Sequence, residues 1–75
     1  MHPAQSKMAR AALKLGVREA AEAAKVSTQT VSRLESGEEL RERTVEDIRR
    51  AYEAAGARFI NADGWVGVLV KAEGS

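Results

Sequence analysis

Residues 17–36 read VREAAEAAKVSTQTVSRLES, a stretch that predicts two short helices joined by a tight turn. The first helix carries small apolar residues that would let a second helix approach it closely: Ala20, Ala21, Ala23 and Ala24. Ser27 stands where a helix N-cap is needed, because its hydroxyl can accept a hydrogen bond from an otherwise unpaired backbone N–H. Val31 and Leu34 follow at an i, i+3 spacing, so one face of the second helix would pack inward.

The opposite face of this second helix is polar, and we call it the reading face. It consists of Thr28, Gln29, Ser32 and Arg33. Side chains of this kind can hydrogen-bond to base edges when a helix lies in the major groove of DNA. Through bidentate bonds, Gln29 would suit adenine and Arg33 would suit guanine. The pattern therefore favours a helix that contacts bases.

Three features of this stretch carry a resemblance to a known family. Ala21, a turn at residues 25–27 and the sequence TVSRLESG at residues 30–37 resemble the lambda-repressor-like (Xre-type) helix-turn-helix proteins. The resemblance continues through ARAAL, TVEDI and AAGARFI at residues 9–13, 44–48 and 54–60, and short bacterial and prophage members end in this way. It implies a transcriptional regulator that binds double-stranded DNA.

Two positions depart from the family pattern. Lys25 stands where the family usually has Gly, although the turn requires a left-handed backbone, which costs a non-Gly residue roughly 1 kcal/mol. Val17 stands where many members have a Gln that bonds a phosphate. Only the backbone N–H of Val17 could do so here.

The resemblance also implies contacts outside the reading face. Candidate phosphate contacts are Val17, Arg18, Ser27, Thr30, Arg41 and Arg43. For the arginines in the connector EELRER (residues 38–43), the alternative is pairing with Glu38, Glu39 and Glu42. Arg10 would form a bidentate ion pair with Glu35 and tie the second helix to the rest of the fold. The alternative there is two independent surface charges.

Helical periodicity predicts one helix before this stretch and one after it. Residues 1–4 are expected to fray, and residues 4–15 form a helix that Gly16 ends. Its inward stripe would be Met8, Ala12 and Leu15, beside Ala9 and Leu13. A near-capping box starts the later helix at Thr44, and Gly56 ends it. Its inward face would be Val45, Ile48, Tyr52 and Ala55.

The pattern changes after residue 56. Two β-rich runs, residues 58–60 and 66–70, flank the turn-forming sequence NADG at residues 61–64, which predicts a β-hairpin. Because an isolated hairpin is marginal in water, we expect its second strand to pair with another copy of the chain, giving a two-fold dimer. The expected interface is Phe59, Trp65, Val66, Val68, Leu69 and Val70. A hairpin folded on its own helices is the alternative.

The predicted fold class is therefore mainly α, with four or five helices and a short C-terminal β-hairpin or strand used in dimerisation. Residues 1–56 would form the DNA-binding domain, residues 57–71 the C-terminal strands and residues 72–75 a disordered tail. A chain of 75 residues buries only about 60% of its surface on folding, so a dimer would add needed stability.

Composition and charge fit this interpretation. Residues 1–36 hold six Lys and Arg against three Glu, a net charge of +3, whereas residues 37–75 hold six against eight acids, a net charge of −2. The chain has no Cys, no apolar run near the roughly 20 residues of a membrane span, and no signal-peptide core at its start. We therefore expect a cytoplasmic protein at the nucleoid.

Two functional hypotheses follow. The first is a homodimeric regulator, by default a repressor, that binds a pseudo-palindromic operator; RNA polymerase or another regulator would be a further partner. The second is an antitoxin-like or adaptor module that binds a protein, with DNA secondary. The carboxylates lie at helical spacing beside basic residues and form no nucleophile–base arrangement, and His2 is the only histidine. We expect no catalysis, cofactor, metal, small-molecule ligand or membrane contact.

Overall fold

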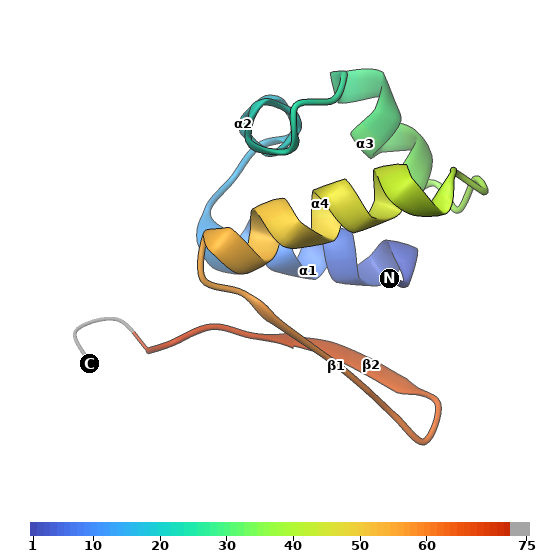
Figure 1. Ribbon diagram of the computed structural model, residues 1–75. Helices are drawn as coiled ribbons and strands as arrows, with labels where there is room; N and C mark the ends of the chain where they lie inside the picture. The colour runs from blue at the N-terminus through green and yellow to red at the C-terminus, as the bar shows by residue number, and fades with distance from the viewer. Residues whose placement is uncertain (73–75) are drawn as a thin grey trace.

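The computed structural model describes residues 1–72, which form four helices followed by a two-stranded antiparallel sheet. The elements are α1 (Pro3–Leu13), α2 (Val17–Ala24), α3 (Thr28–Glu35), α4 (Glu42–Ala54), β1 (Arg58–Ala62) and β2 (Trp65–Leu69). Figure 1 shows α2 and α3 on one side of α1 and α4, with the hairpin on the opposite side. The mainly α class with a C-terminal hairpin is confirmed. The predicted tail falls largely on residues 73–75, which lie outside the described residues.

Small side chains let the helices pack closely around α4. The central buried cluster consists of Ala9, Ala20, Ala24, Leu34, Ile48, Tyr52 and Ala57. Of the four alanines expected to face inward on α2, three are buried, and Ala23 is exposed. Val31 and Leu34 are buried on α3 as the i, i+3 spacing predicts, so α3 turns its polar side chains to solvent.

The inward face of α1 differs from the predicted stripe. Gln5, Ser6 and Ala9 are buried, whereas Met8 is 38% exposed and Ala12 is exposed. The predicted stripe was wrong at Met8 and Ala12, because it assumed that only apolar side chains face the core. Ala9 is buried, and Leu13 and Leu15 are partly buried against the core, as predicted. Buried polar groups are stable where they find partners, and Gln5 Nε2 donates to the carbonyls of Ile60 (3.1 Å) and Gly67 (3.0 Å) on the hairpin.

Both ends of α1 also differ from the prediction. His2 Nδ1 accepts a hydrogen bond from the Ala4 N–H (3.0 Å), and Gln5 Oε1 accepts one from the His2 N–H (2.9 Å). This capping box orders the start of α1, so the expected fraying of residues 1–4 was wrong. The helix ends at Leu13, earlier than predicted, because Lys14 takes the left-handed conformation (φ 59°). Gly16 is instead the N-cap of α2.

Helix α4 begins two residues before the predicted start. Arg41 is its N-cap and makes no side-chain capping bond, so the capping box expected at Thr44 was wrong. Ile48 and Tyr52 are buried and Val45 is partly buried, but Ala55 is exposed. The chain leaves the helix at Gly56, whose φ of 115° suits glycine.

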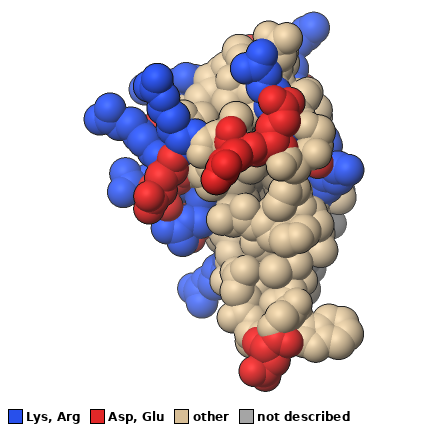
Figure 2. All heavy atoms as spheres, turned by 90° about the vertical axis from the view of Figure 1, so that its right-hand side faces the viewer, with Lys and Arg blue, Asp and Glu red and all other residues tan. Residues whose placement is uncertain are grey.

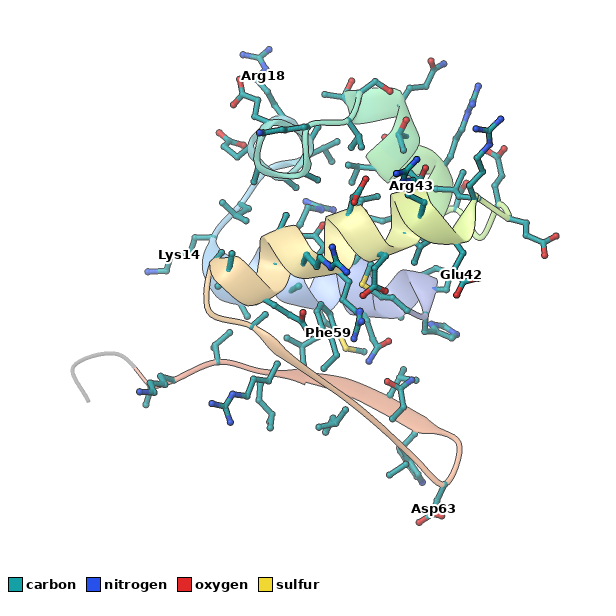
Figure 3. The ribbon with its side chains drawn as sticks, in the orientation of Figure 1. Lys14, Arg18, Glu42, Arg43, Phe59 and Asp63 are labelled. Atoms are coloured by element: carbon teal, nitrogen blue, oxygen red, sulfur yellow. The ribbon has the colours of Figure 1, made fainter. Side chains whose placement is uncertain are left out.

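The hairpin turns at the predicted dipeptide and packs on its own helices through one face. Asp63 (φ 53°) and Gly64 (φ 83°) link the paired residues Ala62 and Trp65, the pattern of a two-residue type I′ turn. Phe59 pairs with Val68 in the sheet, and both pack against the core; the Phe59 ring lies 6.2 Å from the ring of Tyr52. Figure 3 shows Phe59 between β1 and the helices.

Candidate nucleic-acid interface

The turn between α2 and α3 takes the conformation that the helix-turn-helix motif requires. Lys25 adopts φ 58° and ψ 43°, in the left-handed region, although it is not glycine. The N–H groups of Lys25 and Val26 donate to the carbonyls of Glu22 (3.2 Å) and Ala21 (3.0 Å), and thus close the end of α2. The chain then reverses within three residues, which sets α3 across α2.

Ser27 caps the start of α3 as its position predicts. Its Oγ accepts a hydrogen bond from the Thr30 N–H (3.1 Å), and the hydroxyls of Ser27 and Thr30 lie 2.8 Å apart. The cap satisfies one of the N–H groups that the first turn of a helix leaves unpaired. An eight-residue helix needs such support, because short helices are marginal in water on their own.

The whole reading face is open to solvent. Thr28, Gln29, Ser32 and Arg33 are all exposed, and none of their side chains forms a hydrogen bond or ion pair within residues 1–72. Their donors and acceptors are therefore available to an external partner. A helix with two buried apolar residues behind this face can present it without rearranging.

Arg10 and Glu35 form a bidentate ion pair that holds the end of α3 to α1. Arg10 Nε lies 2.8 Å from Glu35 Oε2, and Arg10 Nη2 lies 2.7 Å from Glu35 Oε1. The side chains are 21% and 7% exposed, respectively, so the carboxylate is almost enclosed. The pair that the family resemblance implied is thus present, and the two charges are not independent.

The pKa values of both groups reflect this pairing. Burial of the Glu35 carboxylate raises its pKa, but hydrogen bonds from Arg10 and Ser6 and the charges of Arg10 and Lys7 outweigh burial, so the pKa lies below its ordinary 4.5. The hydrogen bond to Glu35 raises the pKa of Arg10. Both groups are therefore charged at neutral pH.

Ser6 and Tyr52 extend this pair, and sequence reasoning did not identify either contact. Ser6 Oγ donates to Glu35 Oε2 (2.6 Å) and also lies 2.8 Å from the Tyr52 hydroxyl. Ser6 precedes Arg10 by four residues, so the two side chains lie on the same face of α1. That spacing is the one sequence signal that could have linked Ser6 to Glu35.

The candidate phosphate contacts lie at the starts of α2, α3 and α4; Arg41 is the N-cap of α4, and Arg43, predicted in the connector, lies in the first turn of that helix. Arg18 is exposed and extends outward from α2 (Figure 3), and Val17 is the first residue of that helix. Arg41 and Arg43 are exposed, and within residues 1–72 neither forms an ion pair with the neighbouring acids. By contrast, Arg49 pairs with Glu46 and Glu53 on α4 itself. The hydroxyls of Ser27 and Thr30 face each other in the cap.

Metal ligands, helix length and surface grooves are the remaining features of the part of the chain that the structure describes. Residues 1–72 bring together no group of three side chains that could hold a metal ion. None of their helices has the length and apolar character needed to cross a membrane. A groove of about 1060 Å³ opens between the C-terminal ends of α1 and α4 and strand β2, and α3 does not line it.

Helix α3 is capped, faces solvent and is set across α2 by a left-handed turn. This arrangement defines a helix-turn-helix domain, a DNA-binding class of fold. A comparison with protein-family models agrees: the model described as a helix-turn-helix domain matches residues 7–59. The chain belongs to this family, which comprises lambda-repressor-like regulators. No curated protein matches the chain.

Proposed function

We propose that this protein is a sequence-specific transcriptional regulator that binds double-stranded DNA as a homodimer and acts as a repressor in the bacterial cytoplasm. Helix α3 would enter the major groove of each half of a pseudo-palindromic operator. The observation that carries this proposal is the reading face, whose four polar side chains are exposed and unpaired on a helix fixed at both ends. Repression follows where the operator overlaps a promoter.

Within this proposal the side chains divide into two roles. Gln29 and Arg33 would each make two hydrogen bonds to one base, with Thr28 and Ser32 beside them, and each good contact discriminates by about 1–3 kcal/mol. Backbone and side-chain donors around them would hold phosphates and set the register. These donors are Val17, Arg18, Ser27, Thr30, Arg41 and Arg43.

The outer face and edge of the hairpin are proposed as the dimer interface. Ile60, Trp65, Leu69 and Val70 are exposed large apolar side chains, and Trp65 is 80% exposed. Residues 65–70 carry no charge, so two copies of β2 could pair without repulsion between like charges. Figure 2 shows a broad uncharged surface over this part of the molecule. Phe59 and Val68 already pack inward, and would support this interface from beneath.

Selection of bound fragments from a random DNA pool tests the proposal. We expect an enriched palindromic motif with half-sites about one helical turn apart, and binding that weakens steeply between about 50 and 200 mM salt. The double variant Gln29→Ala/Arg33→Ala should fold normally and enrich no motif. Equal enrichment by the variant would refute the assignment of the reading face.

The exposed hairpin face also favours a second candidate, an antitoxin-like or adaptor protein whose main partner is another protein. Co-purification with one partner at fixed stoichiometry, together with DNA binding that shows no sequence preference, would favour this candidate. A dimer with a defined operator would favour the first.

A further inference from the structure

A buried hydrogen-bonded chain joins α1, α3 and α4 at the last turn of α3. Its members are Tyr52 on α4, Ser6 on α1 and Glu35 on α3, with separations of 2.8 Å and 2.6 Å between successive oxygens. Ser6 has no exposed surface and Tyr52 is 1% exposed, so water does not compete for these bonds. No buried side-chain nitrogen or oxygen in residues 1–72 lacks a partner.

The direction of each bond follows from the protons available. An ionised carboxylate only accepts hydrogen bonds, so Ser6 donates its single hydroxyl proton to Glu35. The Tyr52 hydroxyl must therefore donate to Ser6 Oγ. Bonds that point one way along a chain polarise and strengthen one another. Loss of the Tyr52 hydroxyl should therefore weaken the contact between Ser6 and Glu35 as well.

Tyr52 supplies a connection that Arg10 cannot. Arg10 and Ser6 both belong to α1, so without Tyr52 the Glu35 carboxylate would be hydrogen-bonded to α1 alone. Through Ser6 and Tyr52 the same carboxylate is also connected to α4. Tyr52 in turn contacts Phe59 on the hairpin, which adds a further point of support.

We propose that Ser6 and Tyr52 are positioning residues for α3: they hold Glu35 against two helices at once and thereby set the angle at which the reading face meets DNA. This inference rests on the proposed function, because the angle matters only if α3 contacts bases. Neither side chain would touch DNA, since both are buried behind α3. Their effect on recognition is therefore indirect.

Amide hydrogen exchange in the free protein tests the first half of this proposal. Tyr52→Phe keeps the ring and removes only the hydroxyl, whereas Ser6→Ala removes both bonds. Tyr52→Phe should lower protection in the last turn of α3 by about threefold to tenfold relative to α2, the range expected for one net hydrogen bond, and Ser6→Ala should lower it at least as much. Adding Tyr52→Phe to Ser6→Ala should cause little further loss, because the chain is already broken. Ile48→Val, which trims the same core away from the chain, is the control and should change all helices evenly.

Binding measurements on the selected operator test the second half. Both variants should weaken specific binding by about threefold to tenfold and leave binding to random-sequence DNA unchanged. A uniform loss of protection across all helices, or unchanged protection in α3, overturns the proposal. So does a loosened α3 with full discrimination between sequences. If the wild-type protein shows no sequence preference, the proposed function fails, and the exchange pattern still decides whether Ser6 and Tyr52 hold α3.

Discussion

Removal of Arg10 should destabilise the protein far more than removal of any surface arginine. In Arg10→Ala the Glu35 carboxylate keeps its bond from Ser6 but loses the opposing charge and two hydrogen bonds while its side chain is only 7% exposed. Breaking a buried ion pair costs about 3–5 kcal/mol, and because Arg10 is 21% exposed, water can enter the vacated space. We therefore expect a loss of about 3 kcal/mol.

The loss is large for a domain of this size. Stabilities of about 0.05–0.15 kcal/mol per residue imply roughly 4–11 kcal/mol in total, and a loss of about 3 kcal/mol would lower Tm by more than about 10 °C. Urea denaturation followed by circular dichroism measures the change directly. Arg49→Ala is the matched control, because Arg49 also forms ion pairs, with Glu46 and Glu53, but is 39% exposed, and it should cost far less than Arg10→Ala. Equal losses in the two variants would refute the account of the Arg10–Glu35 pair.

Three further predictions follow from other features. Because the folded-state pKa of Glu35 lies below its ordinary 4.5, this group stabilises the protein above that pH, and the contribution should disappear as pH falls through the folded pKa. In urea denaturation from pH 7 to pH 3, the free energy of unfolding should therefore decline less steeply in Glu35→Gln than in the wild type. Parallel curves would contradict this. Lys25→Gly should raise the free energy of unfolding by up to about 1 kcal/mol, because the backbone of Lys25 is left-handed (φ 58°). A lower free energy of unfolding in chemical denaturation would show that the Lys25 side chain contributes more stability than the backbone strain costs. If the protein forms the proposed dimer, Trp65→Lys should convert it to a monomer in analytical ultracentrifugation without unfolding it, since Trp65 is 80% exposed. A variant that remains dimeric would exclude Trp65 from the interface.

The central motif could be predicted from sequence because its signals are local. Ser27 at the cap and the apolar pair Val31 and Leu34 lie within eight residues, and their spacing leaves one arrangement of buried and exposed faces. The hairpin was predictable for the same reason, since Asp63 and Gly64 suit a two-residue turn between β-rich runs. The Arg10–Glu35 pair came from family resemblance alone, because nothing in either residue's local sequence indicates its partner.

The inward face of α1 could not be predicted, because it depends on partners distant in sequence. Gln5 and Ser6 interrupt the apolar pattern, and a periodicity argument places polar residues outside. Their burial is stable only because the hairpin carbonyls, Glu35 and Tyr52 supply hydrogen bonds. The start of α4 was missed for another reason: Arg41 caps it without a side-chain bond, so the true boundary carries no capping signal.

The most direct test of base reading by α3 is the effect of Arg33→Ala on sequence preference at each operator position. Affinities for the selected operator and for every single-base substitution would be measured for both proteins at the same salt concentration. The account predicts that the variant loses about 1–3 kcal/mol of preference at one guanine in each half-site and keeps its preference elsewhere. An unchanged preference at every position would contradict it.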